Sequence, residues 1–135
     1  MIEKIEHNGV VLGIVLRAET DPETTVFYTG KESPIQLGVV KHEQGYVEPA
    51  HFHKKTEKVI TEVFESIQMQ YGTAELEFYN EQGNLISSCI LNPGDTIVYG
   101  GIHRIKAVST FKAIKIKQGP YTSLEDDKLF IEVKG

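Results

Sequence analysis

Two histidines separated by one residue are the first feature of the chain that points to chemistry. They are His51 and His53, in the segment 49–53. In a β-strand, residues i and i+2 project to the same face, so the two imidazoles would converge on one point. Neutral imidazole is the commonest side-chain metal ligand in proteins. The pair therefore predicts part of a binding site for a divalent metal ion.

A carboxylate from a neighbouring strand would extend this ligand set, and the chain offers three candidates. Glu65 shares its strand phase with aliphatic residues, whereas Glu62 shares its phase mainly with serine and glutamine. A carboxylate that faces inward among aliphatic side chains needs a metal ion or hydrogen bonds to offset its desolvation, which favours Glu65. Glu57 lies in a lysine-rich segment and is expected to be exposed. A β-bulge before residue 65 would invert the phase argument, so Glu62 and Glu57 stay open as alternatives.

A third histidine, His103, is placed where it can reach the same site. It follows a Pro-Gly-Asp turn at 93–95, a short apolar run and the pair Gly100-Gly101, which lets the backbone bend. Its phase-mates Ile105 and Ala107 are apolar, so this face of the strand is expected to point inward. These donors do not choose between iron, manganese, nickel and zinc. The candidate metal ligands are therefore His51, His53, Glu65 and His103.

Short β-branched and aromatic runs must position these residues. No segment keeps a 3.6-residue apolar period, and turn residues recur about every ten positions. The pattern predicts an all-β domain whose strands close into a barrel or double-sheet jelly roll, because closure hides strand edges. One helical turn is expected at 122–127 and a last strand at 129–133. The other expected strands are 10–17, 25–29, 35–41, 59–71, 73–79, 85–91, 96–99, 104–109 and 111–118.

With these residues in order, the chain resembles the cupin superfamily. The first cupin motif, G(X)5HXH(X)3,4E(X)6G, is similar to the series Gly45, His51, His53, Glu65 and Gly72. The Gly-to-His and Glu-to-Gly spacings are intact, while the gap before the glutamate is longer than in the motif. The resemblance implies a single-domain jelly-roll barrel in which the two histidines and Glu65 bind the metal.

The second cupin motif, G(X)5PXG(X)2H(X)3N, is matched less completely. The chain keeps Gly94 and His103 but is two residues shorter between them. Gly100 stands where the motif has proline, and Ala107 stands where it has asparagine. The resemblance covers about residues 39–118 and implies that His103 completes the metal set.

The C-terminal tail, 119–135, is expected to pack outside the barrel. With the residues just before it, it resembles the tail of small cupins that accompany saccharide biosynthesis, through Lys117-Gln118-Gly119-Pro120-Tyr121 and the later Asp126-Asp127-Lys128. This resemblance implies a carbohydrate ligand and a homodimer. We expect a metal-dependent isomerase, epimerase or dioxygenase acting on a sugar derivative, with a non-catalytic saccharide-binding or regulatory module as the alternative. Tyr71, which has the strand phase of Glu65, is the candidate substrate contact.

Composition narrows the class of protein further. The chain has 135 residues with 14 basic and 19 acidic side chains, a net charge of −5, and is expected to form one domain. Nucleic-acid binding rests on clustered Lys and Arg, so this balance argues against such a partner. Uncharged runs fall short of the roughly 18 residues that a membrane helix needs. The single cysteine, Cys89, fits a reducing compartment, so a cytoplasmic protein is expected.

Overall fold

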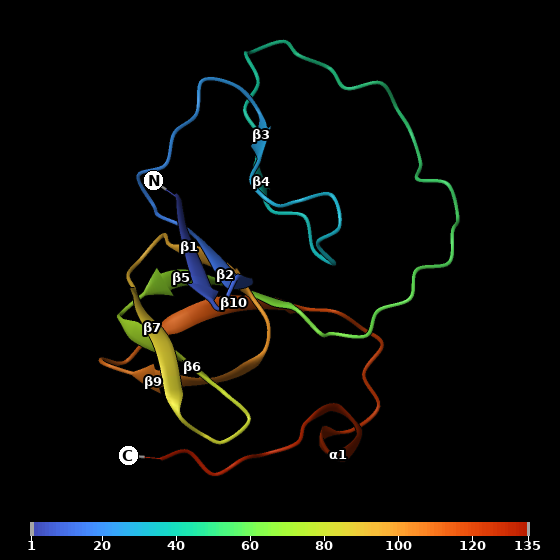
Figure 1. Ribbon diagram of the computed structural model, residues 1–135. Helices are drawn as coiled ribbons and strands as arrows, with labels where there is room; N and C mark the ends of the chain where they lie inside the picture. Colours follow the sequence, from blue (N-terminus) through green and yellow to red (C-terminus); the bar gives the residue numbers. More distant parts are fainter. Residues whose placement is uncertain (1, 135) are drawn as a thin grey trace.

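The computed structural model describes residues 2–134, and their regular structure is almost entirely β (Figure 1). The predicted all-β class is therefore confirmed. The elements are β1 (Ile2–His7), β2 (Val10–Leu16), β3 (Val26–Phe27), β4 (Gly38–Val39), β5 (Glu65–Tyr71), β6 (Ala74–Tyr79), β7 (Leu85–Leu91), β8 (Thr96–Tyr99), β9 (Ile102–Ala107), β10 (Lys112–Lys117) and the short helix α1 (Leu124–Asp127).

Two antiparallel sheets enclose the core. One has five strands in the order β1-β2-β8-β5-β10, and the other has three in the order β7-β6-β9. The strands β3 and β4 form a small separate ladder. Among residues 2–134 the sheets do not close into a barrel, because one sheet ends at β1 and β10 and the other at β7 and β9. The core lies between the two large sheets and is built from inward side chains, among them Val15, Ile67, Met69, Leu76, Phe78, Leu91, Ile97 and Tyr99.

The N-terminal strand β1 is not among the expected strands. It is rich in charged residues and lies at a sheet edge, where β-propensity patterns are weak. It pairs with β2 through the two-residue turn Asn8-Gly9, whose φ angles are 51° and 78°. Positive φ at both positions is what the tightest hairpin turns require, and Asn-Gly is the sequence that adopts it most easily. The turn therefore creates an edge strand that composition alone does not indicate.

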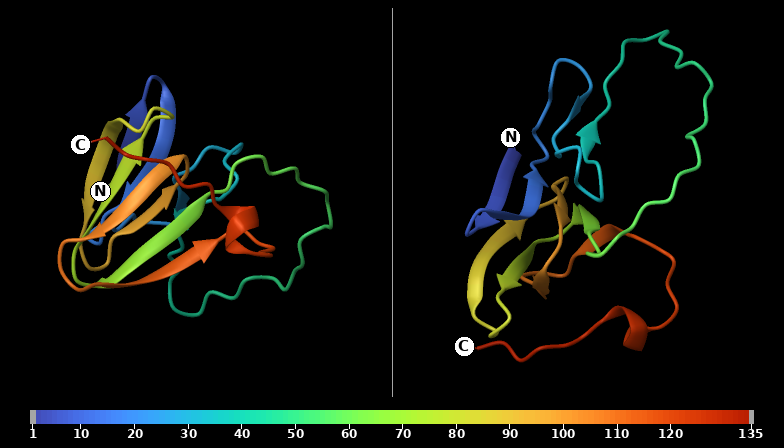
Figure 2. Two further views of the ribbon diagram at one scale, coloured as in Figure 1. Left: turned by 90° about the horizontal axis from the view of Figure 1, so that it is seen from below. Right: turned by 45° about the vertical axis from the view of Figure 1, so that its right-hand side comes forward.

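The expected strand 59–71 is wrong in its first half, since β5 begins only at Glu65. Residues 40–64 form neither helix nor strand within the described chain, and they swing away from the sheets as one wide loop (Figures 1 and 2). The reason lies in the neighbours of β5. Its pairing with β8 ends where Glu65 meets Tyr99, and its pairing with β10 ends where Glu65 meets Lys117. Upstream of Glu65 neither strand continues, so β-prone residues there have no ladder to join.

The other differences concern short segments. The expected strands 25–29 and 35–41 are reduced to the two-residue strands β3 and β4, and the helical turn is confirmed as α1. The expected strand 129–133 is wrong: in the described part of the chain these residues join no ladder. Instead, apolar side chains of this segment lie against a pocket, and the N–H of Lys134 donates to the carbonyl of Gly83 (2.8 Å).

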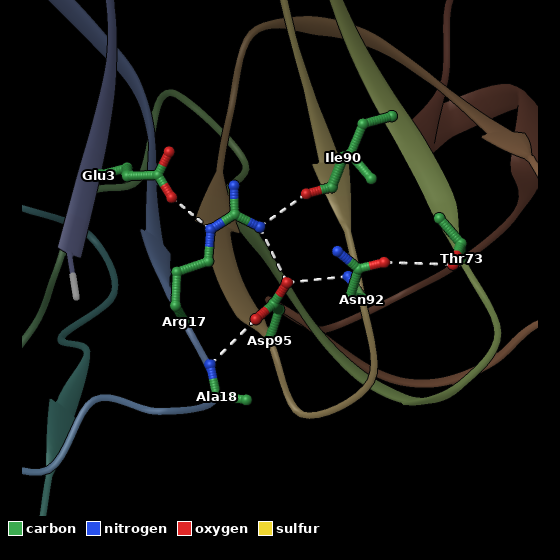
Figure 3. Close-up of polar contacts among 7 residues, drawn as sticks. All are labelled: Glu3, Arg17, Ala18, Thr73, Ile90, Asn92 and Asp95. Carbon is green, nitrogen blue, oxygen red and sulfur yellow. Dashed lines mark hydrogen bonds and ion pairs between the residues drawn. The ribbon is translucent and has the colours of Figure 1, made fainter.

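A buried carboxylate, Asp95, joins the end of β2 to the turn between β7 and β8 (Figure 3). Its Oδ1 accepts from the N–H of Ala18 (3.0 Å), and its Oδ2 accepts from Arg17 (2.8 Å) and from the N–H of Asn92 (2.8 Å). Arg17 in turn donates to the carbonyl of Ile90 (2.7 Å). The end of β2 is thereby fixed to the turn between β7 and β8, which sets where β8 begins.

No helix among the described residues has the length and apolar character needed to cross a membrane.

Candidate functional site

A pocket of about 560 Å³ lies beside β9 and β10, an edge strand of each large sheet. One wall is polar and comes from the start of β5, the end of β8, β9 and β10. The opposite wall is the C-terminal segment 128–133, which contributes leucine, phenylalanine, isoleucine and valine side chains. The polar wall includes Glu65, Tyr99, His103, Arg104 and Lys115.

Glu65 is the buried centre of the polar wall, with only 7% of its surface exposed. The Tyr99 hydroxyl donates to its Oε2 at 2.8 Å, and the Lys115 ammonium lies 3.1 Å from the same oxygen. The sheet register explains both contacts. Glu65 and Tyr99 are direct partners across β5 and β8, while Lys115 stands opposite Ile67 and reaches Glu65 diagonally.

These contacts keep Glu65 ionised. Burial by itself raises the pKa of the carboxyl, but the hydrogen bonds from Tyr99 and Lys115 and the nearby charge of Lys115 outweigh it. The net result is a pKa of Glu65 below its usual value. Burial, with the hydrogen bond and charge of Glu65, raises the pKa of Tyr99, so the phenol remains a neutral donor.

His103 faces Glu65 with a free ring nitrogen. Its Nδ1 lies 2.8 Å from the carbonyl of Gly101. A carbonyl only accepts hydrogen bonds, so Nδ1 carries the proton and Nε2 presents a lone pair. That Nε2 lies 3.8 Å from Oε1 of Glu65, which is too long for a hydrogen bond. Gly101 has a φ of 75°, and this left-handed conformation turns its carbonyl back towards the ring.

The other two predicted ligands, His51 and His53, lie on the exposed loop 40–64 and not on a strand, so the expected strand position is wrong. Their rings are nevertheless neighbours, with centroids 5.4 Å apart. The Nδ1 of His51 lies 2.9 Å from the carbonyl of Pro49 and 3.0 Å from a carboxylate oxygen of Glu48. Both partners are acceptors, so Nε2 of His51 is also left with its lone pair.

The four predicted ligands therefore stand as two pairs. Glu65 and His103 meet in the pocket, and His51 and His53 meet on the loop. No group of three or more His, Cys, Asp or Glu side chains suited to a metal ion exists among residues 2–134. Metal binding by the full set stays a prediction. Of the three candidate carboxylates, Glu65 is the buried one, as its strand phase predicts, and the alternatives Glu57 and Glu62 are exposed on the loop.

Tyr71, the predicted substrate contact, lies at the far end of β5 from Glu65. The two residues are six positions apart along the strand, a separation of roughly 20 Å. Tyr71 is 54% exposed and is not one of the residues that line the pocket in the described structure. Its role as a substrate contact stays a prediction. The tyrosines that do reach the pocket are Tyr79 and Tyr99.

A second buried carboxylate, Glu77, accepts hydrogen bonds from two side chains of the pocket wall, Tyr79 and Arg104. Oε1 of Glu77 accepts from the Tyr79 hydroxyl (2.9 Å) and from Nε of Arg104 (2.9 Å). Burial raises the pKa of Glu77, but these two bonds and the charges of Lys106 and Arg104 lower it more. The Tyr79 hydroxyl and Nε of Arg104 are thus already engaged. Glu65 Oε1 and His103 Nε2 remain the pocket atoms best placed to receive a ligand.

Lys115 has no counterpart among the predicted site residues. Its signal in the sequence is modest: a lysine in the same strand phase as Ala113, where an inward-facing strand position would carry an apolar side chain. Only the pairing of β10 with β5 turns that position into a contact with Glu65.

Comparison of the chain with protein-family models, with curated proteins and with solved structures found no match. What the site does must be inferred from its own geometry.

Proposed function

We propose that this protein is a metal-dependent cupin enzyme that acts on a small polar molecule, such as a sugar derivative, in the pocket beside Glu65 and His103. The observation that carries the proposal is the pre-oriented pair itself. A buried, ionised carboxylate and an imidazole with a free Nε2 face each other 3.8 Å apart at a pocket wall.

The donors present fit a divalent ion. Bonds from zinc to imidazole nitrogen or carboxylate oxygen are about 2.1 Å, so two atoms that hold one ion lie within about 4.2 Å of each other. The separation of 3.8 Å between Glu65 and His103 meets this condition. Imidazole and carboxylate together suit iron, manganese, nickel and zinc. His51 and His53 would complete the set, and their rings are already neighbours, with centroids 5.4 Å apart.

The chain between the two pairs is long enough for this. Twelve residues lead from His53 to Glu65. They span at most about 40 Å when extended, and a loop of this length also folds back on itself at modest entropic cost. The closed jelly roll belongs to the same proposal, because a strand formed by the loop beside β9 or β10 would cover an open edge. Covering exposed edges is what natural sheets do.

In such a site the chain's own residues would hold the ion and orient its ligands. A bound ion would act as a Lewis acid on a carbonyl or hydroxyl of the ligand. Tyr99 holds the Glu65 carboxylate in place, and the carbonyl of Gly101 orients His103. Apolar side chains of the tail, such as Phe130, line the other wall. This arrangement suits isomerisation, epimerisation or oxygenation of a polar substrate.

Elemental analysis of protein purified without an affinity tag tests the proposal. We expect a divalent metal at close to one per chain, or its uptake when iron, manganese, nickel or zinc salts are added. His103→Ala and His53→Ala should each lose most of the metal, and Glu62→Gln, a matched change on the loop, should keep it. Less than about 0.2 metal per chain with no uptake would overturn the proposal.

The second candidate is a non-catalytic module that holds a saccharide in the same pocket. One observation favours it: Tyr99 and Lys115 already satisfy Oε2 of Glu65 without a metal ion. Turnover separates the two functions. A sugar that binds with the pocket intact but is not converted, under air or anaerobically and with metal supplied, would favour the binding module.

A homodimer and a cytoplasmic location complete the proposal. The outer edges of both sheets give a second copy surfaces to pair with, because β10 and β9 end their sheets in the described structure. Light scattering at micromolar concentration is expected to give twice the mass of the chain.

A further inference from the structure

We propose that Lys115 is a built-in cation that pairs with Glu65 and competes with a divalent ion for this carboxylate, so that it lowers the metal affinity of the site. This inference rests on the proposed function. It concerns a residue that the cupin motifs do not include.

The contact is specific to this lysine. Lys115 reaches Glu65 diagonally across the β5–β10 ladder, with its ammonium 3.1 Å from Oε2. Two neighbouring cations have other partners: Lys117 pairs with Asp127 (2.8 Å), and Arg104 pairs with Glu77 (2.9 Å). Within the described chain, Lys115 is thus the Lys or Arg side chain that forms an ion pair with Glu65.

The two donors to Oε2 differ in their freedom to move. Tyr99 is 1% exposed, and its ring lies edge-on to Phe78 and His103. Lys115 has a side chain that is 48% exposed, on a long flexible stem. When a second cation approaches the carboxylate, the phenol stays and the ammonium can withdraw into water. Lys115 is therefore the exchangeable partner.

Charge makes the exchange competitive. Two cations within a few ångströms of one carboxylate repel each other, and this repulsion is strong where water is partly excluded. With Lys115 in place, a divalent ion that binds Oε1 of Glu65 comes close to the ammonium on Oε2 and is repelled by it. Without Lys115 this repulsion is gone, while Tyr99 still donates to Oε2, so metal should bind more tightly.

Calorimetric titration with Zn²⁺ at pH 7 tests this directly. Lys115→Met keeps most of the stem and removes the charge, and we expect it to bind Zn²⁺ about tenfold more tightly than the unchanged protein. Lys115→Gln should tighten binding in the same direction and serves if the methionine variant folds poorly. Lys115→Arg keeps the charge and should bind no more tightly than the unchanged protein. Lys112→Met, at the other end of β10, is the matched control and should leave the affinity unchanged.

Thermal unfolding supplies a second readout that does not depend on activity. Without metal, Lys115→Met should melt below the unchanged protein, because Glu65 is left buried without its cation. With saturating Zn²⁺ this deficit should disappear or reverse. A purely structural lysine would give the same deficit with and without metal.

The outcomes separate the two proposals. If the unchanged protein binds Zn²⁺ and Lys115→Met binds it equally or more weakly, the role of Lys115 is overturned and the proposed function stands. If neither the unchanged protein nor any Lys115 variant binds Zn²⁺, both are overturned.

Discussion

Two buried carboxylates, Asp95 in the turn before β8 and Glu65 at the start of β5, have different surroundings. Asp95, 4% exposed, has hydrogen bonds on both oxygens, two of them from backbone N–H groups. Glu65, 7% exposed, has both of its close partners on Oε2, and its Oε1 faces the His103 ring across 3.8 Å. The two carboxylates are buried to a similar degree, but only Asp95 has hydrogen bonds on both of its oxygens. A fully bonded buried carboxylate is a structural anchor, whereas a half-bonded one beside a pocket is the better candidate for chemistry.

Removing the anchor should give the largest loss of stability. Asp95→Ala leaves the Arg17 guanidinium and the N–H groups of Ala18 and Asn92 without their common acceptor. We expect a loss of about 3 kcal/mol in the free energy of unfolding, measured in urea. If Asp95→Ala unfolds at nearly the same urea concentration as the unchanged protein, Asp95 is not a structural anchor.

The same kind of change at Glu65 should affect ligand binding more than stability. Glu65→Gln keeps the shape and can still accept a hydrogen bond from Tyr99, but it loses the charge. We expect Zn²⁺ affinity to fall by about 100-fold or more, since even residues behind the direct ligands cost 10- to 100-fold. Asp95→Asn is the matched control and should retain Zn²⁺ binding. Equal loss in both variants would mean that the two carboxylates do not differ in role.

A smaller effect is expected from the donor behind Glu65. Tyr99→Phe removes the hydroxyl that lies 2.8 Å from Oε2 and leaves the ring in the core. We expect Zn²⁺ affinity to fall about tenfold, as for other partners that orient a metal ligand. Tyr79→Phe, which removes a hydroxyl bonded to Glu77 instead, should leave Zn²⁺ affinity unchanged.

The sequence predicts the burial of Glu65 but not its partners. Strand phase predicts that Glu65 is buried, because alternation is a local property. The partners Tyr99 and Lys115 depend on the registers of β8 and β10 against β5, which join residues 34 and 50 positions away in the chain. The contact of His103 with Gly101 is local, and the glycine pair before His103 indicates the bend.

In the loop 40–64 the sequence predicts a strand that the structure does not have. Residues 59–64 are β-branched or aromatic in most positions, so local propensity predicts a strand. A strand also needs a partner, and the ladders on both sides of β5 stop at Glu65. Local propensity therefore predicts a strand at 59–64 that has no partner strand to pair with.

The smallest expected effect is the pH dependence of stability, whose direction tells whether the pKa of Glu65 is lowered or raised in the folded protein. Its folded pKa lies below the ordinary value of 4.5, so its ionised form contributes stability above pH 4.5. That contribution is lost as the pH falls through the folded pKa, where the carboxyl takes up a proton. The stability difference between the unchanged protein and Glu65→Gln should therefore be constant from pH 7 to about 5 and shrink below it. Urea unfolding at several pH values measures this difference. A gap that widens on acidification would mean that burial, rather than Tyr99 and Lys115, governs Glu65, and the half-bonded carboxylate would then be neutral at the acid end of the range.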